Sequence, residues 1–379
     1  MKTIIVFLFV SMLFISCGSG EDPVIISDNG DDSSGSSDIE VKSLIVVDSI
    51  GLELGDTNYV FGSIEAIDRT AEGNILLLDR PACSVIEYTP EGEFVQRMGR
   101  QGSGPGEFNN PLAMTRLGDG RVAVLDPNRG GFFTFFEDGT FEAAAMQLLG
   151  EPILWITPSI ENTFIGTYNS WDQVNDEFVV TAVVGRFDVE SGDPITTYWE
   201  TSFPWDFQDI TVLMKGSYFA RTWTSNRDGY VFVAPRSPED YIISGFTATG
   251  EPTVTIELEI EQVRKSEEEI AEEAFFWNTR ARNMGANGPF NYQPDEHRWM
   301  IHSMGIDGEN RLWVRRGTEE TPTFDVFDFE GNYLFKAELE GVGGPDGLFW
   351  EIRVDEFGIV AYSLDPADGY QKLYMLEIQ

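Results

Sequence analysis

The side chains best suited to chemistry in this chain of 379 residues are a set of arginines, two aspartates and two histidines. The sequence contains no G-x-S-x-G nucleophile motif, no P-loop and no H-E-x-x-H zinc motif. A guanidinium binds a carboxylate through two parallel hydrogen bonds, so arginines near strand ends could line a funnel for an anionic or sugar ligand. The alternative is that they form salt bridges with the abundant acids. Five arginines stand near the ends of predicted strands: Arg80, Arg116, Arg221, Arg316 and Arg353.

Two aspartates, Asp79 and Asp126, end equivalent predicted strands in the segments LLLD and AVLD. A ring of such carboxylates at a channel mouth would suit Ca²⁺, which prefers oxygen ligands. The alternative is structural, because an aspartate in this position accepts hydrogen bonds from backbone N–H groups of a neighbouring turn. Regular repetition favours the structural role. The sequence therefore predicts no metal site, and Ca²⁺ stays open as the one cofactor to test.

The two histidines of the chain, His297 and His302, lie close together in the sequence, where a predicted loop meets a predicted strand. They could form a metal pair or supply a general base. Two histidines alone do not make a typical transition-metal site. We favour the alternative of hydrogen-bonded imidazoles at the surface or rim, and no catalytic residue is predicted.

A repeated unit of short strands must position these residues. Residues 63–98 and 112–146 share one order: strand, acidic turn with glycine, strand ending in aspartate, loop, aromatic strand, second glycine turn and strand. Similar units with more variation occupy 151–200, 227–258, 305–339 and 350–378, which gives six units of four strands. The turn glycines of the first two units have equal spacing: Gly73 and Gly92, then Gly120 and Gly139.

Four-stranded units that repeat at this spacing are typical of β-propeller blades. Short apolar runs bounded by turn residues, such as residues 75–79 and 122–126, suit strands that are buried on both faces. One such unit cannot bury its own faces, so the units must close into a ring. The last unit has about three clear strands, and we expect an N-terminal strand at 43–48 to complete it.

The segment Gln101–Phe108, followed by Pro111, resembles the G-x-GPGEF…P linker between blades of NHL-repeat proteins. A second, altered copy occupies 341–348. On these motifs the chain resembles the bacterial six-bladed β-propeller lipoproteins that are grouped with TolB-like propellers. The resemblance implies an all-β, six-bladed propeller and no single activity. Related propeller lactonases and hydrolases use acid and amide ligands that converge on a central calcium.

One segment, over about 266–283, predicts a helical insertion. Ser266 and Glu269 have the spacing of a capping box. Apolar residues follow at one-face spacing, with glutamates at the start and arginines near the end, as suits the helix dipole. We expect this helix to lie over one face of the ring.

The N-terminal segment predicts export and lipid anchoring. Residues 1–16 have the charged start and short apolar run of a signal peptide. Cys17 stands where a lipoprotein is acylated; the alternative is an ordinary secretory signal. Residues 17–42 predict a disordered acidic Gly/Ser linker, and 43–379 the propeller. Cys83 then has no disulfide partner and is expected to be a buried small hydrophobe.

Charge limits the partners of the chain. It has 64 acidic residues against 25 Lys and Arg, for a formal net charge of −39. Such a charge repels nucleic acid and argues against any role in binding it. The acid excess also suits a halophilic protein, because salt screens self-repulsion; acidic surfaces in ordinary secreted proteins are the alternative.

Three functions remain open from the sequence. The first is a cell-envelope lipoprotein that is attached to a membrane through its lipid, and we expect this to be the outer membrane, on its periplasmic or outer side. Its propeller would bind an envelope protein, a glycan or a small molecule. The second is a calcium-dependent lactonase, esterase or lyase acting in the central channel. The third is a structural part of a larger outer-membrane assembly. The sequence favours the first.

Overall fold

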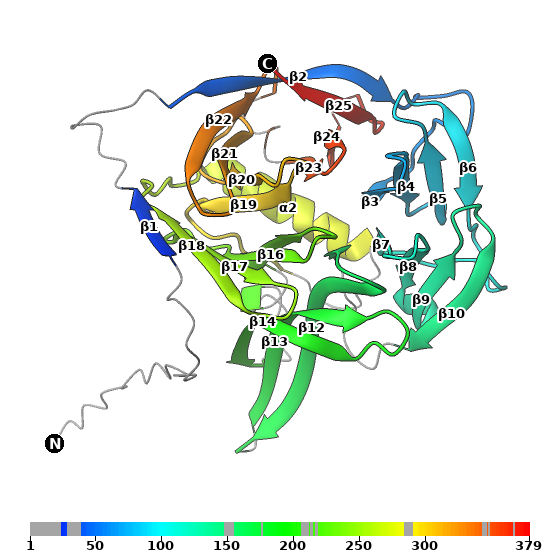
Figure 1. Cartoon of the computed structure of the whole chain (residues 1–379), viewed down its shortest axis with the longest axis horizontal. Helices are drawn as coiled ribbons and strands as arrows, with labels where there is room; N and C mark the ends of the chain where they lie inside the picture. The colour runs from blue at the N-terminus through cyan, green and yellow to red at the C-terminus, as the bar shows by residue number, and fades with distance from the viewer. Residues whose placement is uncertain are drawn as a thin grey trace.

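Short strands make up most of the chain, and in a computed structural model they form five hydrogen-bonded sheets. The sheets stand around a common centre in a propeller arrangement (Figure 1). The structure describes residues 24–28, 39–147, 155–175, 177–205, 212, 215–216, 219–283, 291–342, 347, 349–366 and 368–379.

Three sheets have four antiparallel strands each, in chain order. The first consists of β3 (Ile64–Arg69), β4 (Ile75–Asp79), β5 (Ser84–Tyr88) and β6 (Phe94–Met98). The second consists of β7 (Ala113–Arg116), β8 (Val122–Asp126), β9 (Gly131–Phe135) and β10 (Phe141–Gln147). A short 3-10 helix, η1 (Pro127–Arg129), connects β8 to β9. The third consists of β11 (Ile156–Pro158), β12 (Thr163–Val174), β13 (Glu177–Asp188) and β14 (Pro194–Pro204).

Two sheets are larger. One has five strands: β15 (Arg221–Ser225), β16 (Tyr230–Pro235), β17 (Tyr241–Thr247), β18 (Pro252–Leu258) and β1 (Val24–Asp28), which pairs parallel to β18. The other has eight strands, in the order β19 (Ile301–Ile306), β20 (Leu312–Arg316), β21 (Thr323–Phe327), β22 (Tyr333–Leu339), β2 (Val41–Ile50), β25 (Leu373–Ile378), β24 (Gly358–Ser363) and β23 (Trp350–Asp355).

Strand β2 joins the two ends of the repeated region. Its first residues run parallel to β22, and its later residues pair antiparallel with β25, the last strand of the chain. Leu44, where the two pairings meet, is fully buried. An N-terminal strand was expected at 43–48 to pair with the last unit, and β2 does so.

Apolar cores lie between neighbouring sheets. Leu76 and Val85 of the first sheet pack with Val124 of the second. Within the eight-stranded sheet, Trp313 of β20 shares a core with Ile352 of β23. The two halves of this sheet therefore pack against each other as separate neighbouring sheets do. Strands such as β4 and β8 bury side chains on both faces because a neighbouring sheet packs against each face.

The glycine-rich linker at 101–108 is structural. Arg129 Nη1 donates to the carbonyl oxygens of Gly102 and Glu107 at 3.2 and 2.6 Å. The Glu107 carboxylate accepts from the Gly104 amide at 2.7 Å. Gly106 has a φ of +68°, and a Cβ there would meet the Phe141 side chain at 3.0 Å. The motif therefore holds a tight connection between the first two sheets.

The third sheet departs from the others in strand length. Its strands β12 and β13 have 12 residues each, against five in β4 and β8. The excess length forms a hairpin that projects from the ring (Figure 1). Trp171 packs edge-on against Trp205 at a centroid distance of 4.6 Å near its base.

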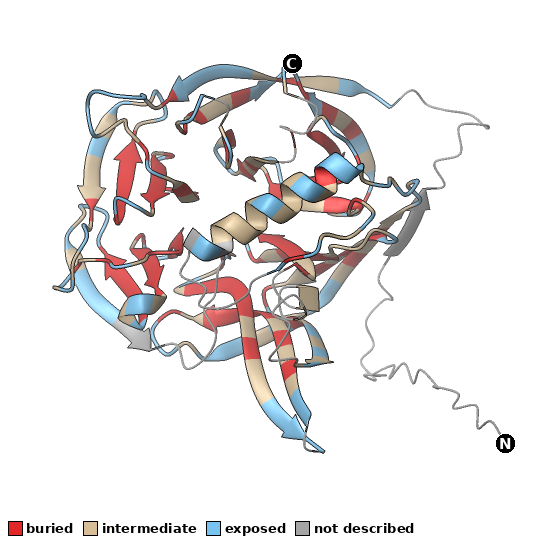
Figure 2. Cartoon of the chain, turned by 180° about the vertical axis from the view of Figure 1, so that it is seen from behind, coloured by how far each residue is buried: buried red, intermediate tan, exposed pale blue. Residues whose placement is uncertain are grey.

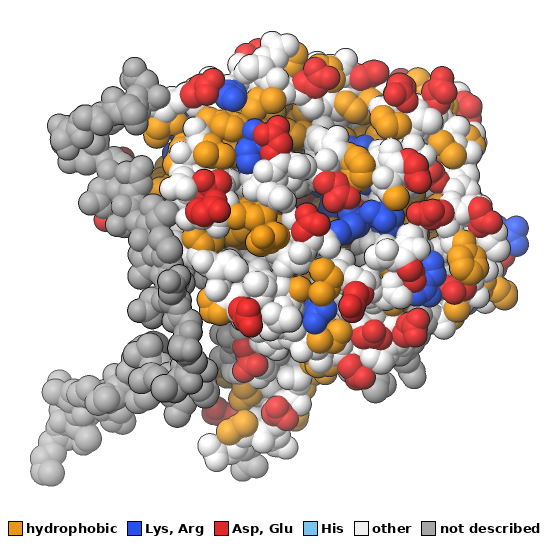
Figure 3. Space-filling model, in the orientation of Figure 1, with side chains coloured by type: hydrophobic (Ala, Val, Ile, Leu, Met, Phe, Trp, Pro, Cys, Tyr) orange, Lys and Arg blue, Asp and Glu red, His pale blue; other side chains and the backbone are white. Residues whose placement is uncertain are grey.

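Helix α2 (Glu267–Asn283) has nearly the predicted bounds and crosses one face of the ring (Figure 2). On the opposite face, acidic side chains are widely spread, and a group of basic side chains lies near the middle (Figure 3). Of the expected 17–42 linker, Val24–Asp28 form β1. Residues 1–23, including Cys17, and 29–38 lie outside the described residues.

Candidate functional site

A cavity of about 230 Å³ lies on the axis of the ring, under α2. The strands β3, β7, β11, β15, β19 and β23 follow one another around this axis. Every one of these strands, and the helix, contributes side chains to the cavity wall. The charged and ionisable ones on the wall include Glu65, Arg221, Arg236, Arg280, His302, Glu351 and Arg353.

Helix α2 closes one end of the cavity. Its Trp277 packs against Phe219 at a centroid distance of 4.8 Å. One turn along the helix, Arg280 Nη2 donates to the Glu65 carboxylate of β3 at 2.8 Å. Both Trp277 and Arg280 line the cavity. The helix therefore contributes to the site as well as covering it.

The start of α2 is held by the predicted capping box. The Ser266 hydroxyl accepts from the Glu269 amide at 3.1 Å, and the Glu269 carboxylate accepts from the Ser266 amide at 2.9 Å. Buried Arg298 adds a 2.6 Å ion pair to Glu269. Glu269 is therefore held from two sides.

Replacing Ser266 with alanine is expected to lower the free energy of unfolding by about 1 kcal/mol, because the Glu269 amide at the helix start loses its hydroxyl acceptor. Urea denaturation followed by far-UV circular dichroism measures the change. Ser266→Thr keeps the hydroxyl and serves as the control. Equal loss in both variants would show that the hydroxyl is not what holds the helix.

Four arginines from four different elements converge on the cavity: Arg221 of β15, Arg236 after β16, Arg280 of α2 and Arg353 of β23. Arg221 lies over the Trp199 ring at 4.3 Å, and Arg236 over the Trp299 ring at 5.2 Å.

In two of these arginines, one guanidinium nitrogen lacks a hydrogen-bond partner. The buried Nε atoms of Arg236 and Arg353 have no hydrogen-bond partner among the described residues. Neither side chain forms an ion pair within that part of the chain. A buried N–H group without a hydrogen-bond partner is costly, so these two nitrogens can gain a hydrogen bond when an anion binds.

Two ionisable groups of the cavity wall come from neighbouring strands, His302 from β19 and Glu351 from β23. Burial raises the pKa of Glu351, although Arg315, Arg236 and Arg280 oppose this shift. Burial, with the positive charges of Arg315 and Arg236, lowers the pKa of His302 well below its usual value. The buried His302 Nδ1 has no hydrogen-bond partner in the described structure. At neutral pH the imidazole is therefore neutral, and the four arginines set a positive local field.

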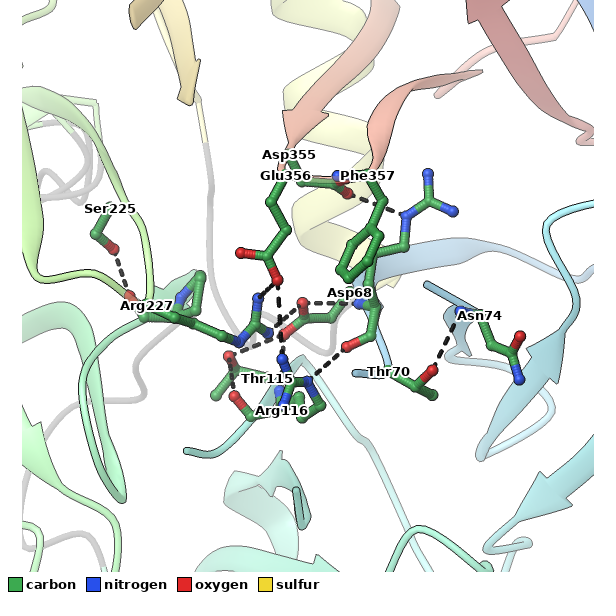
Figure 4. Close-up of polar contacts among 12 residues, drawn as sticks. Asp68, Thr70, Asn74, Thr115, Arg116, Ser225, Arg227, Asp355, Glu356 and Phe357 are labelled. Atoms are coloured by element: carbon green, nitrogen blue, oxygen red, sulfur yellow. Dashed lines mark hydrogen bonds and ion pairs between the residues drawn. The ribbon is translucent and has the colours of Figure 1, made fainter. Parts of the chain in front are cut away.

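The opposite end of the axis is closed by ion pairs. Arg227 Nη2 donates to Asp68 at 2.8 Å and its Nη1 donates to Glu356 at 3.2 Å (Figure 4). Asp68 also accepts from the Thr115 hydroxyl at 3.0 Å and from the Arg116 amide at 2.7 Å. We call these five residues the polar plug. A second cavity, of only about 60 Å³, lies beside the plug, and Arg353 lines both cavities.

The plug carries a strongly acidic carboxyl group. Burial by itself would raise the pKa of Asp68, but the positive charges of Arg227 and Arg353 outweigh burial and lower that pKa to about 2. Asp68 is therefore ionised at any ordinary pH. Charged side chains therefore fill the end of the axis opposite α2.

The structure separates the five arginines that the sequence grouped together. Arg221 and Arg353 line the cavity, as a ligand funnel would require. Arg80 lies outside it, in a groove beside α2, where its Nε donates to Asn110 at 2.8 Å. Arg116 lies in the plug, 3.8 Å from Glu356. Arg316 lies inside the eight-stranded sheet and binds both oxygens of buried Asp325 at 2.8 and 2.9 Å.

The two aspartates have the structural role. Asp79 accepts from the Gly62 and Ser63 amides at 3.0 and 3.2 Å. Asp126 accepts from the amides of Asn109 and Asn110 at 2.6 and 3.0 Å. Each aspartate lies at the end of the second strand of its sheet and binds the segment that precedes the first strand. Backbone amides occupy both carboxylates, and no group of three or more His, Cys, Asp or Glu suited to a metal occurs in the described residues. These residues do not fit a central calcium.

Sequence reasoning missed three members of the site. His302 was expected at the surface or rim, and it lines the cavity. His297 does not line the cavity, and its backbone forms an isolated antiparallel β-bridge with Arg264. Arg236 and Glu351 had no sequence signal beyond their positions just after or at the start of a predicted strand. Cys83 is buried, as expected, and has no disulfide.

No protein-family model matches the chain, and no curated protein matches its sequence. Solved structures do match. A protein of Bacteroides fragilis described as exported superposes with a TM-score of 0.50 at 14% identity, over 94% of this chain and 100% of that chain. A member of the duf4221 family from Bacteroides vulgatus has a TM-score of 0.51 at 9% identity, over 89% and 98%. At such identities the likeness extends to the fold alone.

Among the residues that the structure describes, no helix combines the length and the apolar character needed to cross a bilayer.

Proposed function

We propose that this chain is a binding protein whose central cavity takes a small organic anion carrying a carboxylate. The observation that carries the proposal is the convergence of four arginines on one cavity, two of them with buried Nε atoms that lack partners. In a chain with a net charge of −39, such a cluster concentrates positive charge at one point. The tryptophans of the wall supply apolar contact for the body of the ligand.

The size of the cavity limits the ligand. Pockets for drug-sized ligands measure roughly 300–1,000 Å³, and this cavity holds about 230 Å³. A single ring or a short acid fits that range. A guanidinium can bind a carboxylate through two parallel bonds, so Arg236 and Arg353 are the two groups we assign to the acid.

Isothermal titration calorimetry with D-galacturonate, succinate and benzoate tests the proposal. D-Galactose, which has the same ring as galacturonate but no carboxylate, is the matched control. We expect at least one of the three acids to bind, with affinity falling as salt is added, and galactose to show no binding. Absence of binding by all three acids would reject the proposal.

Anion affinity is expected to rise as the pH is lowered through the titration of Glu351. Protonation of Glu351 removes a negative charge from the cavity wall, and its raised pKa moves this change above the ordinary value of about 4.5. Proton uptake by His302, favoured once an anion is bound, acts in the same direction. The fixed charges around these two groups are Glu65, Arg236, Arg280 and Arg315.

Titrations with a fixed anion at successive pH values measure this dependence. Glu351→Gln has an uncharged side chain at all pH values, so most of the increase in anion affinity at lower pH is expected to be lost in this variant. An affinity that falls with acidification above the pKa of the ligand itself would contradict the assignment.

We further propose that the ring has six blades, closed by β2. The two halves of the eight-stranded sheet share a core that includes Trp313 and Ile352, in the way that separate neighbouring sheets share theirs. Counted as two blades joined by β2, this sheet and the other four give the six units that the sequence repeats predict. The proposal agrees with the resemblance of residues 101–108 to the NHL-type linker.

We also propose that the protein is an envelope lipoprotein of the outer membrane, acylated at Cys17. The support is the apolar run and small residues before this cysteine. Labelling with radioactive palmitate is expected to mark the protein, and Cys17→Ala is expected to abolish the label and release the protein from the membrane fraction. A Cys17→Ala variant that stays labelled would contradict acylation at this position.

A further inference from the structure

A groove of about 810 Å³ runs beside α2, outside the central cavity. One wall is the helix, with Glu272, Phe275 and Thr279. The other wall consists of loops before and after the first strands, including Ser63, Asn109 and Asn110. The groove is more than three times the volume of the central cavity, so it can hold several units of a chain-like ligand.

The charges of the groove cancel. Its two basic side chains, Arg80 and Arg280, are matched by two acidic ones, Glu272 and Asp365. Amide and hydroxyl groups make up most of the other polar lining. Phe275 is 71% exposed on the helix, an unusual position for a large aromatic residue. A neutral wall rich in hydrogen-bonding side chains, with an exposed aromatic ring, suits a ligand rich in hydroxyl groups with flat apolar faces.

The backbone of the groove offers little to a peptide. An extended peptide is bound chiefly through free backbone N–H and C=O groups. Along the loop wall, the amides of Gly62 and Ser63 already donate to Asp79, and those of Asn109 and Asn110 to Asp126. Side chains are therefore the donors and acceptors left to a ligand, which favours a sugar chain over a peptide.

The groove and the cavity meet. Arg280 and Leu364 line both spaces. The carboxylate of Glu65 lies at this junction, 2.8 Å from Arg280 and 3.8 Å from Arg80. A ligand whose acidic end lies among the cavity arginines would thus have its remaining units in the groove.

From these observations we infer that the groove binds the body of an acid-terminated glycan, a chain of sugar units whose terminal uronic acid enters the central cavity. The inference rests on the proposed anion site and adds the class of ligand to it. Phe275 stacks on a sugar ring, and the side-chain amide groups of Asn109 and Asn110 bind hydroxyl groups. The cavity arginines hold the carboxylate.

Calorimetry with D-galacturonate and tetragalacturonate tests the inference. We expect the tetramer to bind about tenfold more tightly than the monomer, since three further sugar units contact the groove. Cellotetraose, which lacks the carboxylate, is expected to bind more weakly than the tetramer. Tetra-alanine, a carboxylate on a peptide chain, is expected to show no gain over acetate.

The variant Phe275→Ala separates groove from cavity. It is expected to lower the affinity for tetragalacturonate by about tenfold and to leave the affinity for galacturonate unchanged. Phe136→Ala removes another exposed phenylalanine, outside the groove, and is expected to change neither affinity. Because Phe275 is largely exposed, its loss should not impair folding.

The outcomes distinguish the inference from the function on which it rests. Equal affinity for monomer and tetramer, or no effect of Phe275→Ala, would overturn the assignment of glycan binding to the groove and would leave the anion site unaffected. Binding of succinate or benzoate without either sugar acid would overturn it in the same way, as would a gain for tetra-alanine. Failure of every acid to bind would reject the anion site itself.

Discussion

The double variant Arg236→Met/Arg353→Met is expected to weaken anion binding by at least about thirtyfold. Each guanidinium has a buried Nε without a partner, and each can make charge-assisted hydrogen bonds to a bound carboxylate. Such bonds contribute about 1.5–3 kcal/mol each, so losing both exceeds a thirtyfold change. Methionine keeps the length and apolar stem of the side chain, so the walls of the cavity stay filled.

Stability is expected to hold or rise in the same variant. Each of the two side chains has a buried Nε without a hydrogen-bond partner, and an apolar replacement removes the cost of that unsatisfied group. Calorimetric titration with the best-binding acid and thermal unfolding of the free protein measure the two effects. Arg264→Met is the control for removal of an arginine far from the cavity, because Arg264 is 73% exposed and pairs with an exposed glutamate. Loss of binding together with a large fall in stability would indicate a structural role instead.

The variant Asp68→Ala is expected to lower the free energy of unfolding by about 3–5 kcal/mol. Asp68 is 2% exposed and is the shared acceptor of Arg227, Thr115 and the Arg116 amide. Removing one partner of a buried pair leaves the other charge uncompensated, which is the costly case for buried ion pairs. Because three sheets meet at this side chain, the loss affects the whole ring.

Urea denaturation measures this loss, and the pH dependence provides a second check. The folded-state pKa of Asp68 is lowered to about 2 from 3.8, so its contribution is fully present above 3.8 and disappears as pH falls toward 2. The gap between the native protein and Asp68→Ala should therefore narrow over that range. Glu296→Gln, which breaks an exposed ion pair, is expected to cost below about 1 kcal/mol. An equal cost for both variants would contradict the role assigned to the plug.

The strands and the helix could be predicted because their signals are local. The runs at 75–79 and 122–126 become β4 and β8 with every residue buried. The capping residues Ser266 and Glu269 mark the start of α2 to within one residue. Pairing of β2 with β25 could also be predicted, because the last unit lacked one strand.

The site could be predicted only in part, because it depends on which end of a strand a residue occupies. The inner strands begin on the side of α2 and end at the plug. Arg221 starts β15 and therefore faces the cavity, whereas Arg116 ends β7 and faces the plug. Arg316 lies on the second strand of its group, away from the axis, where Asp325 neutralises it. Position near a strand end did not distinguish these cases.

Arg236 and His302 show a further limit. Each is an ordinary residue in sequence, and it becomes part of a site only because the ring brings separate units together. The same holds for Glu351, which burial alone makes unusual. Local patterns predict elements, while convergence of side chains depends on the closed ring.

Pairing of β1 with β18 has a consequence for the orientation of the protein at a lipid surface. Val24 is the seventh residue after Cys17, so a chain acylated at Cys17 spans at most about 25 Å before it meets β18. In such an acylated chain the short connection places the outer edge of that sheet against the bilayer, and the axis of the ring then lies parallel to the membrane plane. Both faces then open parallel to the membrane plane, where ligands diffusing along the envelope reach them from the side.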